Sequence, residues 1–171
     1  MTEATSTVIG CNTALLTTVQ LTQVNHLAMK SSISGCDLMK NAGRLVAQAI
    51  IQRWTPRPVL VMCGPGNNGC EGFAAAQCLA EADWPVRVAL LASNDSLRSE
   101  AAHHATLWHG SIEPLTPAAL NGAELVVDAL FGTGLSGSLE GTAARTLAEA
   151  GARKMMIVAV DVPSVLAPIE Y

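Results

Sequence analysis

The sequence predicts an α/β protein of three layers, in which helices cover both faces of a mainly parallel, Rossmann-like sheet. Two observations lead to this fold class. Four runs are apolar without polar alternation, which is typical of strands buried on both faces: 58–63, 85–92, 124–130 and 155–161. Alanine- and leucine-rich segments of helical length lie between these runs. Strands that alternate with helices indicate βαβ units and therefore a parallel sheet.

The helices are expected in chain order around these strands. Apolar residues recur at helical spacing over 37–54, so this segment should cover one sheet face before the first strand begins. The segment 18–32 is a weaker helix candidate. Three further helices should follow the strands: 71–83, 97–109 and 142–152. Met155 and Met156, at the start of the last strand, are expected in the core.

The length and composition describe a single compact domain over residues 1–171. Half of the residues are hydrophobic and only 14% are charged, yet no apolar run reaches the roughly 18 residues that a membrane span needs. The first residues lack the basic start and apolar core of a secretory signal. We therefore expect a cytoplasmic protein with no membrane partner.

Cysteine content and charge exclude several classes of protein. Five cysteines at irregular spacing fit neither a disulfide framework nor a zinc site with paired ligands, so free thiols are expected. The formal net charge of −4 comes without a basic stripe, which argues against nucleic acid as a partner. These features favour a small-molecule ligand.

The first unusual loop follows the first apolar run and reads Gly64-Pro65-Gly66-Asn67-Asn68-Gly69. In open parallel sheets, ligands bind beyond the carboxyl ends of the strands, where this loop lies. Glycines permit a tight turn, and the helix that follows offers free N–H groups to an anion. The pattern is neither the dinucleotide fingerprint nor a P-loop. The alternative is a plain turn between strand and helix.

Two more loops carry polar residues at predicted strand ends. Asp128 lies inside an apolar strand, where a carboxylate needs hydrogen bonds, a charged partner or a cation, so backbone amides of its own loop are an alternative to a bound ion. Asp161 ends the last strand, with Ser164 after a stiff Pro163; Asp161 could also merely cap that turn. Such oxygen ligands suit a hard cation and not zinc.

Four segments together resemble the NAD(P)H-hydrate epimerase family, the YjeF N-terminal domain. They are "NAGR" (41–44), "VLVMCGPGNNGCEGFAAAQCLAE" (59–81), "VVDALFGTGLSGSLEG" (126–141) and "VAVDVPS" (158–164). The resemblance implies a Rossmann-like α/β/α fold that interconverts the R and S epimers of NADHX and NADPHX, cofactors hydrated at C6 of the nicotinamide ring. It also implies an ADP- or ATP-dependent dehydratase as functional partner, which repairs the S epimer.

The resemblance also implies roles for individual residues. Asn68, Asp128 and Ser164 would bind a potassium ion. The hydrated dinucleotide would contact three segments, whose residues are Asn67, Asn68, Gly69, Cys70, Glu71, Gly132, Thr133, Gly134, Leu135, Ser136, Gly137, Ser138 and Asp161. Asp161 is our candidate for acid–base catalysis, because it is an ionisable group at a strand end that faces the ligand loops.

The chain departs from the family pattern at two places. The family reads Gly-Gly-Asp where this chain has Gly69, Cys70 and Glu71. Cys70 would be strained if its φ were positive, and Glu71 keeps the charge but moves it outward by one methylene. After Ser164 the family's Gly-Leu-Asp is absent, so the strand 155–161 should lie at a sheet edge and favour a homodimer.

These departures leave alternatives to a fully active epimerase. One is an impaired or inactive fold that binds a nucleotide or serves as a protein scaffold. Another is a fragment of a bifunctional epimerase and dehydratase. Conversion of R-NADHX to S-NADHX would distinguish an active epimerase from both.

Overall fold

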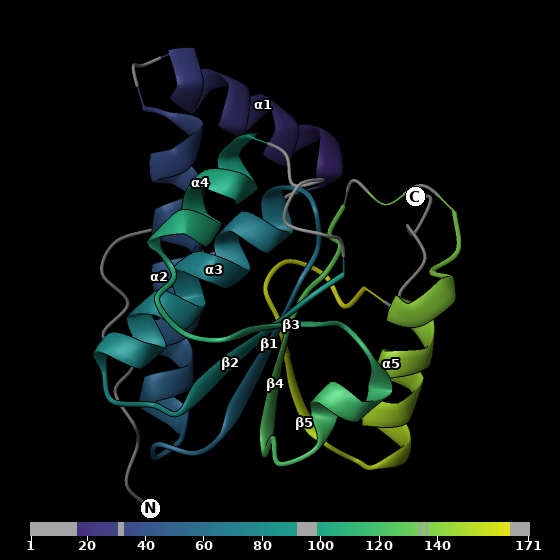
Figure 1. The fold of residues 1–171 in the computed structure, drawn as a ribbon. Helices are drawn as coiled ribbons and strands as arrows, with labels where there is room; N and C mark the ends of the chain where they lie inside the picture. Colours follow the sequence, from purple (N-terminus) through teal and green to yellow (C-terminus); the bar gives the residue numbers. More distant parts are fainter. Residues whose placement is uncertain (1–16, 31–32, 92–98, 134, 136, 165–171) are drawn as a thin grey trace, which may run out of the picture. The chain divides into compact units, whose positions relative to one another are not determined.

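The computed structural model describes residues 17–30, 33–91, 99–133, 135 and 137–164. The chain divides into two compact units, Met1–Ile33 and Ser34–Tyr171. The described part of the first unit consists mainly of helix α1, Thr18–Lys30. The second unit contains the sheet and the remaining helices (Figure 1). A single domain over residues 1–171 therefore stays a prediction.

A parallel sheet forms the centre of the second unit. Its strands are β1 (Val59–Cys63), β2 (Val86–Leu90), β3 (Ile112–Pro114), β4 (Leu125–Ala129) and β5 (Met156–Ala159). They lie in the order β3-β2-β1-β4-β5, and every neighbouring pair is parallel. β1 and β4 are buried along their whole length, as their unbroken apolar sequences predict. The predicted fold class is confirmed.

Helices cover both faces of this sheet (Figure 1). They are α2 (Gly35–Arg53), α3 (Asn67–Glu81), α4 (Ser99–Leu107), the short 3-10 helix η2 (Pro117–Leu120) and α5 (Gly141–Ala152). One core layer packs α2 and α3 on the sheet through Ile50, Phe73 and Leu79. The other packs α5 and η2 on the opposite face through Leu120 and Leu147. Alternate strand residues serve the two layers, because successive side chains of a strand point to opposite faces.

The predicted elements differ from the structure in three places. α3 begins at Asn67, four residues before the predicted helix, because the glycine-rich turn is shorter than expected. β3 and η2 were not predicted. Met156 is 37% exposed instead of belonging to the core, because it lies on the edge strand. No helix in the described part of the chain is long and apolar enough to cross a membrane.

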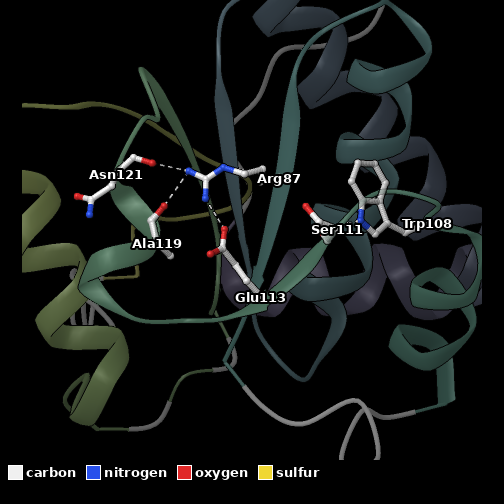
Figure 2. A network of polar contacts seen from close by, with 6 residues as sticks. All are labelled: Arg87, Trp108, Ser111, Glu113, Ala119 and Asn121. Atoms are coloured by element: carbon white, nitrogen blue, oxygen red, sulfur yellow. Dashed lines mark hydrogen bonds and ion pairs between the residues drawn. The ribbon is translucent and has the colours of Figure 1, made fainter.

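A polar network fixes the unpredicted elements to the sheet (Figure 2). Arg87 on β2 forms an ion pair with Glu113 on β3 and donates hydrogen bonds to the carbonyls of Ala119 (3.0 Å) and Asn121 (2.7 Å) at the end of η2. The planar guanidinium can serve several acceptors at once because it carries five donors. Arg87 thus joins β2, β3 and η2 near the amino end of β2, away from the carboxyl ends of the strands.

Candidate functional site

The glycine-rich turn after β1 leads directly into the first turn of α3. Asn68, Gly69, Cys70 and Glu71 are all helical, and the Cys70 amide donates to the Gly66 carbonyl (3.2 Å). Asp83 and Lys154 are the only non-glycine residues with positive φ in the described part. Cys70 is therefore helical, and the strain that a positive φ would cause is absent.

The turn is tight because two backbone segments touch. A Cβ atom at Gly69 would overlap the carbonyl oxygen of Gly64, so no larger residue fits there without a shift of the backbone. This close approach brings the start of α3 against the end of β1. The first helical N–H groups consequently face the carboxyl edge of the sheet.

A buried carboxylate lies at the end of β4. Asp128 is 1% exposed, and it accepts hydrogen bonds from the Ser164 amide (2.8 Å), the Ser164 hydroxyl (2.7 Å) and, more weakly, the Leu130 amide (3.3 Å). Ser164 is 2% exposed, and its hydroxyl also accepts from the Phe131 amide (3.0 Å). The side chains of Asp128 and Ser164 therefore join the loop after β4 to the loop after β5.

The hydrogen bonds satisfy Asp128 without neutralising it. The sequence alternative, amides of its own loop, accounts only for the weak bond from Leu130, because the stronger amide bond comes from Ser164 in the loop after β5. Among the described residues, the ion pairs are Arg87 with Glu113 and Arg153 with Glu149, so no basic side chain pairs with Asp128. The same residues contain no group of three or more His, Cys, Asp or Glu that could hold a metal ion. A cation here would have to use amide, hydroxyl and carboxylate oxygens together.

Asn68 and Asp161 approach each other over Gly132. A Cβ at Gly132 would lie 2.6 Å from Asn68 Oδ1 and closer still to Asp161 Oδ2, so a larger residue would have to displace one of these side chains. Asp161 Oδ2 also accepts from the Thr133 amide (3.0 Å). Asn68 Nδ2 is buried and has no hydrogen-bond partner in the described part. A buried amide without a partner is costly, so Asn68 is suited to a ligand.

Glu71 lies one turn into α3 and is half-buried. Burial and the nearby Asp161 carboxylate raise the pKa of Glu71 to about 7. The expectation that Glu71 keeps its charge is thus wrong near neutral pH, where the side chain is only partly ionised. Glu71 in α3 and Asp161 after β5 thus bring a partly protonated and an exposed carboxyl group near each other.

A cavity of about 650 Å³ adjoins Asp128 and Ser164 on the α5 face of the sheet. Leu135 and Ser138 line it from the loop after β4, and residues of α5 and β5 supply half of its wall. Asn68, Glu71 and Asp161 do not line this cavity. The space is thus largely apolar and continues along α5 instead of following the glycine-rich turn.

The structure gathers most of the predicted site residues at the carboxyl ends of β1, β4 and β5. Direct contacts link Asp128 with Ser164, and Asp161 with Thr133. Gly134 and Ser136 lie outside the described residues. Gly137 and Ser138 are exposed, and so is Asn67.

Sequence reasoning missed the part played by Phe131. Its amide and carbonyl both lie at hydrogen-bond distance from the Ser164 hydroxyl (3.0 and 2.9 Å). These are backbone groups, so no residue type could have signalled them.

Comparison with protein families identifies a match over residues 35–168, to the family described as YjeF-related protein N-terminus. The matched range contains all three loops of the site. It begins at the start of α2.

Three curated relatives are similar over most of this chain. An NAD(P)H-hydrate epimerase of Rhodobacter capsulatus is 37% identical over 165 residues, which cover 89% of this chain and 77% of the relative. One of Rhodopirellula baltica is 31% identical over 87% of this chain and 64% of its own length. A bifunctional NAD(P)H-hydrate repair enzyme Nnr of Coxiella burnetii is 33% identical over 89% of this chain, but the chain spans only 32% of that protein.

A solved structure agrees with the fold. The crystal structure of the yeast protein ynu0 (YNL200c) matches with a TM-score of 0.69 and 21% sequence identity. The match covers 84% of this chain and 68% of the yeast chain.

Replacement of Glu71 by glutamine should change how stability depends on pH. A carboxyl group with a raised folded pKa stabilises the fold fully below its unfolded pKa of 4.5, and this contribution is lost as pH rises towards 7. Glu71→Gln should therefore gain stability over the unchanged chain between these pH values, by up to about 3 kcal/mol. Urea denaturation at several pH values measures the free energy of unfolding of both chains. The exposed Glu124→Gln is the control, and an equal pH dependence in both variants would contradict the assignment.

Proposed function

The chain belongs to the family of YjeF-related protein N-termini, and from this premise we propose that it interconverts the R and S epimers of NADHX and NADPHX. The observation that carries the proposal is the similarity to a relative named NAD(P)H-hydrate epimerase, which extends over 77% of that relative. The geometry supports it independently, because ionisable and polar side chains meet at the strand ends where open α/β sheets bind ligands.

We propose that the start of α3 and the loop after β4 bind the dinucleotide. The N–H groups of the first turn of α3 can approach its phosphates, and Gly132 leaves room beside Asn68 and Asp161. Gly132, Thr133 and Leu135 follow β4 directly. Gly134, Ser136, Gly137 and Ser138 complete the proposed binding segment.

Acid–base catalysis is assigned to Asp161. Its carboxylate is exposed, and the Thr133 amide fixes one of its oxygens at 3.0 Å. A proton must move at the C6 hydroxyl whether the epimers exchange through loss of that hydroxyl or through ring opening. Glu71, whose pKa is about 7, supplies a partly protonated carboxyl group nearby. A partly protonated carboxyl group can either donate or accept this proton.

A potassium ion is proposed for the buried end of the site. Asp128 is a carboxylate that no basic side chain of the described residues pairs with, and the Ser164 hydroxyl lies 2.7 Å from it. Asn68 would contribute its Oδ1 oxygen, since its buried Nδ2 is a hydrogen-bond donor and cannot bind a cation. Hard oxygen ligands of this kind fit the residues present. When bound, the ion would supply positive charge beside the dinucleotide phosphates, while the three side chains hold the loops that bind it.

The cellular setting follows from the same comparisons. Bifunctional relatives join an additional region to a similar segment, so we propose a nucleotide-dependent dehydratase as the functional partner. No disulfide joins the described cysteines, Cys36, Cys63, Cys70 and Cys78, which suits the reducing cytoplasm.

Conversion of R-NADHX to S-NADHX is the test of this function. The chain should accelerate it well above the spontaneous rate. Asp161→Asn should lower the rate by about a hundredfold or more, because general acid–base catalysis contributes at least that much. No acceleration by the unchanged chain would contradict the proposal.

Gly132→Ala tests the geometry of the same site. The added methyl group must displace Asn68 or Asp161, so the rate should fall strongly. Gly151→Ala is the matched control, because a Cβ there meets nothing within 4 Å. A Glu71→Asp variant tests the position where this chain has Glu and the family has Asp. A faster rate would mean that the extra methylene of Glu71 limits catalysis, and an unchanged rate would mean that it does not.

Potassium should raise the melting temperature more than tetramethylammonium does at equal ionic strength, because a ligand that binds the native state stabilises it. Asp128→Ala should abolish the difference between the two salts. An identical response of the unchanged chain to both salts would exclude the proposed ion.

A further inference from the structure

The segment Asn-Ala-Gly-Arg (41–44) resembles the epimerase family, yet it lies on α2 and outside the proposed site. Gly43 is its buried residue. The other buried residues of α2, Ala47 and Ile50, follow at helical spacing and belong to the core that α2 shares with α3 and the sheet. Gly43 extends this buried face by one turn towards the beginning of α2, where it meets α3 (Figure 1).

Gly43 brings the backbone of α2 into contact with the first two turns of α3. A Cβ atom at Gly43 would overlap the carbonyl oxygen of Glu71. The same atom would lie 2.7 Å from Ala74 Cβ and 2.8 Å from the backbone nitrogen of Ala75. Two of these three atoms belong to the backbone, and a methyl group cannot rotate away. An alanine at this position would therefore have to shift one helix against the other.

The opposite side of the same turn packs on the sheet. Gly72 follows Glu71 directly in α3. A Cβ atom at Gly72 would lie 2.6 Å from Ala129 Cβ on β4 and 2.8 Å from Cys63 Sγ on β1. The turn thus lies between α2 and the strands, with no free space on either side. Because it cannot move into the sheet, a push from α2 would tilt it or slide it along the sheet.

The helix α2 is the better anchored of the two contacting parts. Ala47 and Ile50 are buried in the core, so lifting α2 away would open close-packed apolar contacts. The first turn of α3 contains Gly69 and Gly72, which have no side chains with which to anchor it. A substitution that forces the two apart should therefore displace the first turn of α3.

We propose that Gly43 is a positioning residue for the site. It lets α2 contact the Glu71 backbone, and this contact fixes where the first turn of α3 lies relative to the loops after β4 and β5. The inference rests on the proposed function, in which this turn offers its N–H groups to the dinucleotide phosphates. Gly43 acts through the Glu71 backbone and not on the dinucleotide itself. A displacement of about 1 Å is enough to matter where orientation controls binding and rate.

Kinetics with R-NADHX test the positioning. Gly43→Ala should raise the KM by about tenfold or more, because displaced N–H groups no longer fit the phosphates. Partial unfolding would lower kcat and leave the KM unchanged, so a raised KM indicates displacement within the folded chain. Gly35→Ala is the matched control on α2, because a Cβ there meets nothing within 4 Å. An unchanged KM in Gly43→Ala, or an equal rise in both variants, would overturn the proposal.

A second variant decides the matter if Gly43→Ala does not fold. Ala74→Ser adds one atom to the same contact from the α3 side. The KM for R-NADHX should then rise in the same direction, by a smaller factor. An unchanged KM in Ala74→Ser would in that case overturn the proposal.

Amide resonances distinguish failure of this inference from failure of the proposed function. If the unchanged chain converts no R-NADHX, the function is wrong, and the position of the turn is measured without substrate. A displaced first turn would move Asn68, which lies against Gly132, the residue before Thr133. In a proton–nitrogen correlation spectrum the Thr133 amide should shift in Gly43→Ala and stay unchanged in Gly35→Ala. A Thr133 amide that does not shift in Gly43→Ala, or shifts equally in both, would overturn the positioning.

Discussion

The site depends on one buried carboxylate. Asp128 sits at the end of a fully buried strand, where an ionised group is tolerated only with several partners. Ser164 supplies two of them, its amide and its hydroxyl, and the same hydroxyl binds the Phe131 backbone. The end of β4 and the loop after it are thereby held to the loop after β5, which is distant in the sequence. If Asp128 lost its partners, the loops after β4 and β5 would lose the buried part of the network that joins them.

Two glycines allow the backbone segments around Asp128 to approach one another closely. Gly69 lets α3 start against Gly64, and Gly132 lets the loop after β4 approach Asn68 and Asp161. The polar groups therefore converge because backbone segments can come within contact distance there. The proposed epimerase site uses this convergence: a buried anchor at Asp128, a catalytic carboxylate at Asp161 and a partly protonated neighbour at Glu71.

Features that depend on the local residue pattern could be predicted from the sequence. Features that depend on contacts between distant residues could not. The long apolar runs predict β1 and β4. Because ligands bind at strand ends in parallel sheets, the sequence also predicts that Asp128 and Asp161 belong to one site. β3 is only three residues long and is held by the Arg87 and Glu113 ion pair, so no periodicity could reveal it. The raised pKa of Glu71 arises from burial and from Asp161, which is distant in the sequence.

A double-mutant cycle between Asp128 and Ser164 tests most directly whether their contact organises the site. The free energies of unfolding of Asp128→Ala, Ser164→Ala and the double variant would be measured by urea denaturation in potassium-free buffer. Because the two side chains are buried and hydrogen-bonded to each other, we expect a coupling energy of about 1 to 3 kcal/mol. Effects that add to within about 0.5 kcal/mol would contradict the central place given to this contact.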